Sequence, residues 1–235
     1  MTTSPLTLEP LFSLGPVPIS APVVVTWAIM VALVTLAAIM SRRLTLVPGK
    51  VQTVMEMLVD ALDSQIRDIV QRDPAPFRAL IGTIFVFVLI ANWSSLVPGV
   101  EPPTAHLETD AALALVVFCA TIGFGIRMRG FAGYLKTFAE PSWVMIPLNL
   151  VEQITRTFSL IVRLFGNIMS GVFVIGIVLS LAGLLVPIPL MALELLTGAV
   201  QAYIFAVLAT VFIGAAVGEQ PKPIADARNR EPETP

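Results

Sequence analysis

Five stretches of this 235-residue chain contain no charged side chain, and they restrict the fold more than any other feature. They cover residues 10–41, 79–100, 111–126, 164–193 and 195–218. A helix needs about 20 consecutive apolar residues to cross the hydrocarbon core of a bilayer. Four of the stretches are long enough, and the third becomes so if its helix extends past Asp110. The sequence therefore predicts an all-α polytopic membrane protein with about five transmembrane spans.

The composition excludes several other classes of protein. Hydrophobic residues make up 56% of the chain and charged residues 13%, whereas a soluble domain is about 25% charged. The single Cys and the single His rule out a disulfide scaffold and a multi-histidine metal site, and a net charge of −2 gives no basic surface for nucleic acid. No glycine-rich phosphate loop or nucleophile elbow is present. We expect no cofactor and no metal.

Positive charge is distributed unevenly along the chain. All Lys and Arg residues except Arg156 and Arg163 lie in segments 42–78, 127–136 and 222–230. The positive-inside rule then predicts an outside N-terminus and a cytoplasmic C-terminus, which requires an odd number of spans. Residues 1–20 contain no Lys or Arg and so do not resemble a secretory signal. We predict an exposed tail at 1–20, a single membrane domain at 21–218 and a disordered cytoplasmic tail at 219–235.

Residues 51–70 have a different pattern, with apolar side chains at helical spacing and acidic ones opposite them. This pattern predicts an amphipathic helix on the cytoplasmic surface of the membrane. Its acidic face disfavours anionic lipid, which leaves a protein partner or a solvated face. After the third span, a basic loop is expected around Gly130 and Gly133.

The apolar pattern from Pro141 to Leu185 is some 40 residues long, about 60 Å if helical. It is too long for one upright span. Pro187 and Pro189 predict a turn, and the last helix is expected over residues 190–217. We therefore predict that the last two helices form a long, strongly tilted hairpin.

Polar residues in this hairpin recur at intervals of three, four and seven, so they share one face of each helix. On the first helix they are Glu152, Arg156, Ser159, Arg163, Asn167 and Ser170; on the second they are Glu194 and Gln201. A charge at the bilayer centre costs at least about 2.5–3.5 kcal/mol, so such residues suggest a function. Two structural explanations stay open: an Arg163–Glu194 salt bridge, and snorkelling of Glu152 and Arg156 to the membrane surface.

The segment Ser159-Leu-Ile-Val-Arg-Leu-Phe-Gly-Asn167 resembles the signature of the a subunit of F-type ATP synthases. Two further segments are similar to that family, Gln201-Ala-Tyr-Ile-Phe205 and, more weakly, Pro102-Pro-Thr-Ala105. The resemblance covers residues 20–218. It implies a stator subunit of the membrane sector, whose partners are the rotor ring of c subunits, the b subunits of the peripheral stalk, the rest of the ATP synthase and membrane lipid. The implied location is the bacterial inner (plasma) membrane.

The resemblance also implies roles for single residues. Arg163 matches the family arginine that faces the carboxylates of the rotor and separates two ion half-channels. Asn167 and Gln201 match amides near that arginine, Glu194 a titratable position of the outer half-channel, and Glu152 a carboxylate on the cytoplasmic side. A guanidinium never gives up its proton in a protein, so Arg163 can separate two paths without relaying protons between them. We expect H⁺ to be the ion, with Na⁺ as the alternative.

The chain departs from the family pattern at two positions. Val172 stands where many relatives carry a second titratable group, and Ser95 stands where some carry Asp. The substitutes for these groups that we consider are His106, Glu108 and Asp110, unless these three form only a solvated loop. The remaining candidates for lining the half-channels are Asn92, Ser95, Ser159 and Arg156.

Two other functional classes fit the sequence less well. A secondary transporter with Arg163 binding an anionic substrate would usually show internal repeats, and none is visible. An intramembrane enzyme would need a nucleophile–base pair or a metal cluster, which the sequence does not offer. The chain by itself is therefore expected to be non-catalytic, with ATP chemistry carried out elsewhere in the complex.

Overall fold

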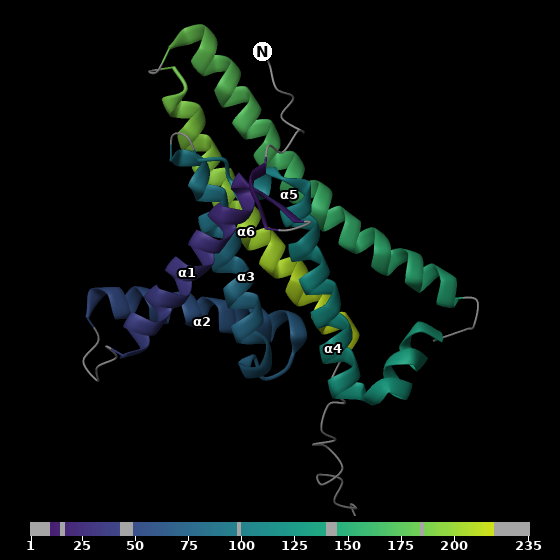
Figure 1. Ribbon diagram of the computed structural model, residues 1–235. Helices are drawn as coiled ribbons and strands as arrows, with labels where there is room; N and C mark the ends of the chain where they lie inside the picture. Colours follow the sequence, from purple (N-terminus) through teal and green to yellow (C-terminus); the bar gives the residue numbers. More distant parts are fainter. Residues whose placement is uncertain are drawn as a thin grey trace, which may run out of the picture.

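The computed structural model describes residues 10–14, 17–42, 49–97, 100–139, 145–183 and 186–218 (Figure 1). The predicted tail at 219–235 and residues 1–9 lie outside these ranges. The elements in chain order are β1 (Pro10–Leu14), β2 (Val17–Ser20), α1 (Ala21–Arg42), α2 (Lys50–Val70), α3 (Ala75–Trp93), η1 (Ser94–Leu96), η2 (Pro103–Ala105), α4 (Leu107–Ala139), α5 (Met145–Ala182) and α6 (Ile188–Val217).

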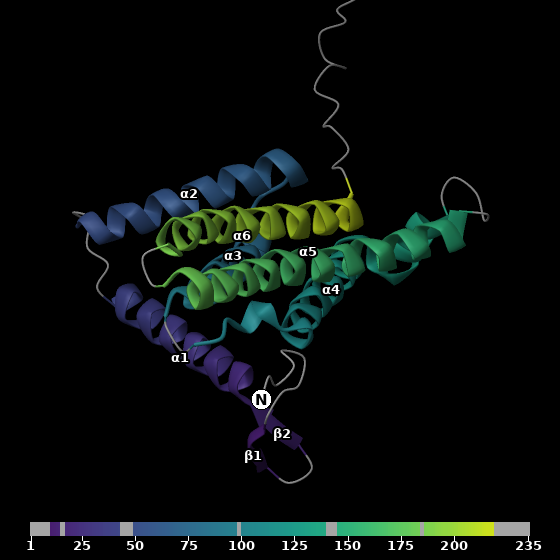
Figure 2. The same ribbon diagram turned by 90° about the horizontal axis from the view of Figure 1, so that it is seen from above.

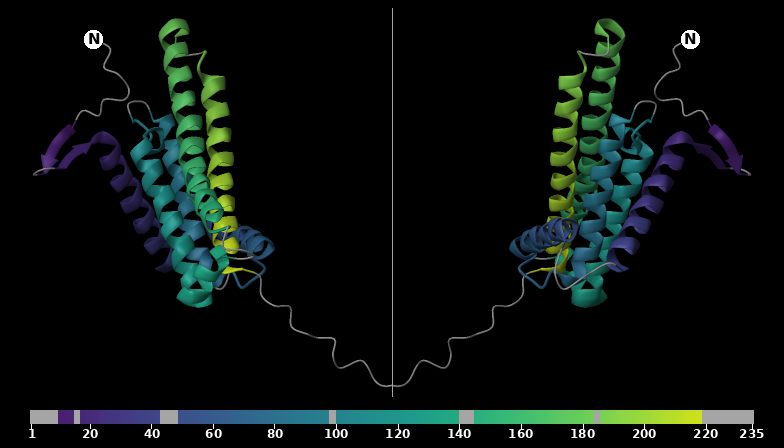
Figure 3. Two further views of the ribbon diagram at one scale, coloured as in Figure 1. Left: turned by 90° about the vertical axis from the view of Figure 1, so that its right-hand side faces the viewer. Right: turned by 90° about the vertical axis from the view of Figure 1, so that its left-hand side faces the viewer.

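The predicted fold class is confirmed, because five of the helices are long and apolar enough to cross a membrane. These spans are Ala21–Arg42, Ala75–Leu96, Leu107–Lys136, Ile146–Leu181 and Ile188–Val217. The start of α1 and the end of α6 lie at opposite ends of the bundle (Figure 3), as an odd number of spans requires. Ahead of α1, β1 and β2 pair as an antiparallel hairpin that the sequence analysis did not predict.

Helix α6 packs against α2, α3, α4 and α5, and Figure 2 shows it between α2 and α5. Small side chains such as Ala202, Ala206 and Ala209 are buried along it. Small residues let helix backbones approach closely in membrane proteins, where dispersion contacts replace the hydrophobic effect between helices. Helix α6 is therefore the packing centre of the bundle, and both hydrophobic clusters include residues from it.

Helices α5 and α6 form the predicted long hairpin, whose 38 and 30 residues lie side by side (Figure 3). Two contacts define their register. Gly171 of α5 abuts Glu194 of α6, and the guanidinium of Arg156 lies 5.6 Å from the ring centre of Phe212. We refer to the end of the bundle near residues 183–188 as the turn end, and to the opposite end as the α2 end.

The predicted amphipathic helix is α2, and only its second half is packed. Ile66 and Val70 are buried in a cluster with α3 and α6. In its first half, Val51, Val54 and Met55 are 66%, 60% and 39% exposed. The apolar stripe read from the sequence thus continues beyond the surface that this chain supplies to cover it.

The prediction of a basic loop after the third span is wrong. Helix α4 continues to Ala139, with one non-helical residue at Gly130 (φ 75°, ψ 162°) that breaks its direction. Glycine adopts this positive φ without a Cβ clash, so the chain bends there without leaving the helical conformation on either side. In the basic stretch before the break, Arg129 donates from Nε to the carbonyl of Val217 at 2.8 Å and so caps the end of α6.

Candidate functional site

Arg163 lies at the middle of α5, about 27 Å from either end of that 38-residue helix. Its side chain is exposed, and no hydrogen bond or ion pair to it is found in the described part of the chain. Ser159 and Ser170 are also exposed on this helix, and Asn167 is half-buried. The predicted polar face of α5 therefore points away from the interior of the subunit.

A groove of about 590 Å³ leads along α5 to Arg163. Its polar lining comes from α5, whereas Leu208 and Phe212 of α6 form the opposite wall. The α5 residues in the lining are Leu148, Val151, Glu152, Thr155, Arg156, Ser159, Leu160 and Arg163. The groove starts toward the α2 end and has Arg163 at its far limit, nearest the turn end.

Glu152 and Arg156 form an ion pair within this groove, one helical turn apart. Both side chains are partly exposed, and the Arg156 guanidinium also stacks over Phe212. This cation–π contact adds attraction that simple snorkelling to the surface does not require. Arg156 is thus held on the wall of the groove, below Arg163.

The hairpin register brings Gln201 to the level of Arg163. Gly171 and Glu194 are in contact, and α5 and α6 are antiparallel. Arg163 lies eight residues before Gly171, and Ala202 lies eight residues after Glu194, so Arg163 is level with Ala202 and with its neighbour Gln201. Gln201 is buried at 7% exposure. Arg163 and Gln201 therefore lie at about the same level, near the middle of the bundle.

Glu194 is buried at 9% exposure, and its Oε1 atom has no hydrogen-bond partner among the described residues. A Cβ atom added at Gly171 would lie 2.7 Å from that oxygen, so glycine is what makes room for the carboxylate. The Arg163–Glu194 salt bridge considered from the sequence does not form within the described chain. Instead the two groups lie about two helical turns apart, since Glu194 is level with Gly171.

Asn92 joins three elements inside the bundle. It is 2% exposed, its Nδ2 donates to the carbonyl of Gly198 at 2.9 Å, and its Oδ1 accepts from the Thr104 hydroxyl at 2.8 Å. Ser95 in η1 is half-buried. Because both polar atoms of the Asn92 amide are engaged, this side chain holds η2 and α6 against α3.

The three candidates at the start of α4 differ in their surroundings. Glu108 is exposed, whereas Asp110 is completely buried, and neither of its carboxylate oxygens has a partner among the described residues. His106 lines a hollow of about 350 Å³ at the turn end, and its Nε2 atom lies 3.4 Å from Oε2 of Glu101. Val172 faces the same hollow from α5.

The sequence analysis missed four residues that the structure places at these positions. They are Glu101 beside His106, Thr104 bonded to Asn92, Gly171 beneath Glu194 and Phe212 beneath Arg156. Two of them had a sequence signal. Gly171 lies four residues after Asn167 and so extends the polar face of α5, and Thr104 lies in the segment 102–105 that is similar to the family. The contacts of Glu101 and Phe212 follow from the folding of the chain and have no such signal.

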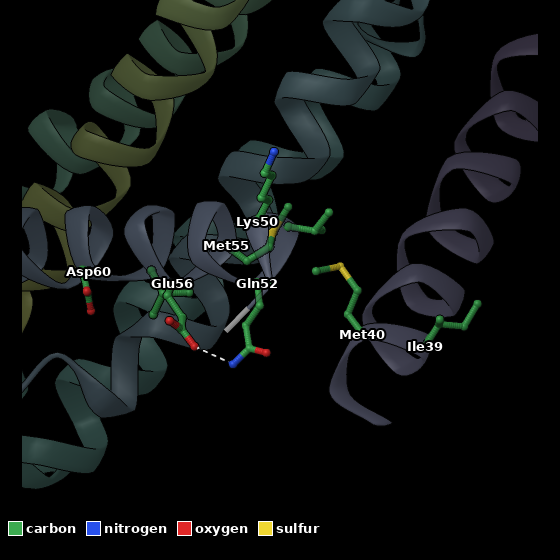
Figure 4. Close-up of a pocket in the computed structure, with 10 residues that line it drawn as sticks. Ile39, Met40, Lys50, Gln52, Met55, Glu56 and Asp60 are labelled. Carbon is green, nitrogen blue, oxygen red and sulfur yellow. Dashed lines mark hydrogen bonds between the residues drawn. The ribbon is translucent and has the colours of Figure 1, made fainter. Parts of the chain in front are cut away.

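A further hollow of about 790 Å³ lies between the last turn of α1 and the first half of α2 (Figure 4). Ile39 and Met40 line it from α1, and Lys50 and Met55 from α2. Gln52 donates to Glu56 at 2.8 Å on the same helix. None of the candidate ion-handling residues lines this hollow. The described residues also contain no group of three or more His, Cys, Asp or Glu side chains placed to hold a metal ion.

The fold and the site together define a polytopic membrane protein with ionisable side chains at mid-span. Such residues are rare inside membranes and mark ion or substrate pathways. The chain matches the family model described as ATP synthase A chain over residues 23–214. This match reaches all five spanning helices and leaves out only residues 21–22 of the first and 215–217 of the last.

Three similar proteins are named as ATP synthase subunit a. The chain is 57% identical to "ATP synthase subunit a 2" of Bradyrhizobium sp. (strain BTAi1), over 94% of this chain and 100% of that protein. It is 45% identical to "ATP synthase subunit a" of Albidiferax ferrireducens, over 87% and 90% of the two chains. It is 46% identical to "ATP synthase subunit a 1" of Prosthecochloris aestuarii, over 86% and 92%.

The chain belongs to the ATP synthase subunit a family. It is therefore a subunit of the membrane sector of an ATP synthase, and its general role is ion transport coupled to ATP synthesis. The resemblance stated from the Arg163 segment is confirmed at the level of the family.

Proposed function

We propose that this chain is the stator of the rotary motor and provides two half-channels to the carboxylates of the c-ring. In this proposal Arg163 separates the half-channels and favours the ionised form of each passing rotor carboxylate. One observation carries it: an exposed, unpartnered guanidinium at the middle of α5, at the limit of a groove that opens toward the α2 end. A charged group left at mid-span needs a partner from outside the chain, and a rotor carboxylate fits.

The groove along α5 is the proposed cytoplasmic half-channel, with Glu152, Arg156 and Ser159 on its wall. The proposed outer half-channel lies at the turn end, where Glu194 is the central carboxylate and Asn92, Ser95, His106, Glu108 and Asp110 are the candidate lining residues. Asn167 and Gln201 hold water or orient neighbours near Arg163. We propose H⁺ as the ion.

The chain would act without catalysing any reaction itself. Its proposed partners are the c-ring on the exposed face of α5 and the b subunits of the peripheral stalk. The uncovered first half of α2 and the hollow beside α1 supply apolar surface for a stalk helix. The proposed location is the bacterial inner membrane, with the turn end outside and the α2 end in the cytoplasm, where Arg72 and Arg129 lie.

The decisive experiment compares the parent complex with Arg163→Ala in sealed vesicles supplied with ATP, with and without Na⁺. We expect the parent to acidify the vesicles without Na⁺ and the variant to assemble yet transport nothing, because the two half-channels are no longer separated. Co-purification of c and b subunits with the variant is the control for assembly. Coupled transport by Arg163→Ala would contradict the proposal, and Na⁺ uptake in place of acidification would change only the ion.

A further inference from the structure

Asp110 is the most deeply buried ionisable side chain in the described part of the structure. Its exposed fraction is 0%, and both of its carboxylate oxygens lack a hydrogen-bond partner among the described residues. Only its backbone is bonded, from its N–H to the carbonyl of His106 at 3.3 Å. Burying a carboxylate without partners is unfavourable, so a merely structural residue at this position would be better apolar.

The position of Asp110 follows from the packing of α4. Asp110, Ala114, Val117 and Thr121 are the buried residues of its first four turns and form one stripe. Ala114 and Val117 belong to the same cluster as Leu164 and Ile168 of α5, and Val172 packs against that cluster. Since α4 and α5 run in opposite directions, Asp110 and Val172 each lie one turn closer to the turn end than these residues.

The ionisable groups around Asp110 are arranged from the surface inward. Glu101, 71% exposed on its side chain, lies beside His106, which lines the turn-end hollow. His106 precedes Asp110 by one helical turn. On α6, Glu194 is the other buried carboxylate with an unpartnered oxygen. Glu108, only two residues from Asp110, points to the exterior and does not belong to this series.

We propose that Asp110 relays the transported ion in the outer half-channel, between the hollow at His106 and Glu194. For a proton, the imidazole of His106, which lines the hollow, takes H⁺ from water there and passes it to the Asp110 carboxylate. Asp110 then passes the proton to the Glu194 carboxylate and returns to its ionised form. A carboxylate that no ion pair holds can do this without breaking another interaction. The inference rests on the proposed function, because it needs an ion path through the subunit.

The experiment compares Asp110→Asn and Asp110→Glu with the matched control Asp68→Asn, an exposed aspartate on α2, all within the complete ATP synthase in sealed vesicles. Rates of ATP synthesis are measured while the ion concentration is varied separately on the outer and cytoplasmic sides. We expect Asp110→Asn to assemble and to lose at least about tenfold in rate, since the amide relays no proton. Asp110→Glu should keep activity but shift the dependence on the outer ion concentration alone. Asp68→Asn should behave as the parent.

Each outcome decides the inference. A parent-like rate in Asp110→Asn overturns it. If Asp110→Asn does not assemble, Asp110→Glu decides: a shift confined to the outer side supports the relay, and a parent-like or two-sided response overturns it. A purely structural role would lower the amount of complex without a one-sided shift. Arg163→Ala, measured in parallel, separates the two proposals: transport retained there refutes the stator, whereas transport lost there but normal in Asp110→Asn refutes only the relay.

Discussion

Helices α5 and α6 have similar sequences in one respect, since each places a few polar residues in an apolar background, yet they use these residues in opposite ways. In the most apolar 18-residue window, 11% of α5 is buried, compared with 44% of α6. The polar side chains of α5 at Glu152, Ser159 and Arg163 are exposed, whereas Glu194, Gln201 and Thr210 of α6 are buried. The polar groups of α5 are therefore exposed at the surface of the subunit, whereas those of α6 lie inside it.

The difference shows how one membrane subunit can both hold its own helices together and supply one side of a functional site. The interior of α6 is closed by contacts within the chain, such as the carbonyl of Gly198 that accepts from Asn92. The outer face of α5 has no such closure around Arg163 in the described structure. The α5 face is therefore expected to depend on a rotor partner, and the α6 face on internal packing.

Among variants that test this difference between α5 and α6, we expect the largest effect from Gly171→Ala, which disturbs the contact between the two helices. The added Cβ would lie 2.7 Å from Oε1 and 3.0 Å from Cδ of Glu194, so the hairpin must open or the carboxylate must move. Overpacking of this kind costs about 1–3 kcal/mol. We expect a lower melting temperature of the purified subunit together with slower ion transport.

Gly176→Ala is the matched control on the same helix, because nothing lies within 4 Å of a Cβ at that position. It should leave the melting temperature unchanged or raise it slightly, as replacing a helical glycine usually does. Equal destabilisation by the two variants would show that the Gly171–Glu194 contact does not govern the hairpin.

A smaller loss of stability is expected from Asn92→Ala, which removes the hydrogen bonds that hold α6 and η2 against α3. The variant leaves the Gly198 carbonyl and the Thr104 hydroxyl without the partners they have now. Losing these buried bonds should cost about 1–2 kcal/mol, or about 2–8 °C in melting temperature for a chain of this length. Ser95→Ala, which removes a half-buried hydroxyl three residues later, serves as the control and should change the melting temperature by less than half as much.

The smallest effect on stability is expected from Arg156→Ala on the exposed face of α5. It removes the ion pair with Glu152 and the stacking on Phe212, both partly exposed. Exposed pairs contribute less than about 1 kcal/mol, so the melting temperature should stay almost constant. A large loss of stability here would show that this face is structural, contrary to the comparison.

The sequence predicted much of this molecule where the signal lies within one segment. The bounds of α5 and α6 agree with the predicted helices at 141–185 and 190–217 to within four residues, because hydropathy and the turn prolines are local properties. The predicted helix at 51–70 is α2. The error at residues 127–136 came from two glycines, which favour loops on average but here allow a change of direction within a helix at Gly130.

The candidate site was predicted only in part from the sequence. Spacing alone put Glu152, Arg156, Ser159, Arg163 and Asn167 on one face, since the period of a helix is fixed. Spacing did not reveal which of Glu108 and Asp110 is buried, because both precede the apolar run of α4 by similar distances. That difference depends on where α4 packs against α5 and η2.

The sequence by itself thus determined the number of spans, the polar face of α5 and the membership of a family, since hydropathy, helical period and a nine-residue motif are all written along the chain. Only the tertiary structure decided that Arg163 is exposed and has no partner among the described residues, that Glu194 fits against Gly171 and that Asp110 is buried. These properties arise from the register and the rotation of one helix against another. They are set by packing between residues far apart in sequence, which no single segment encodes.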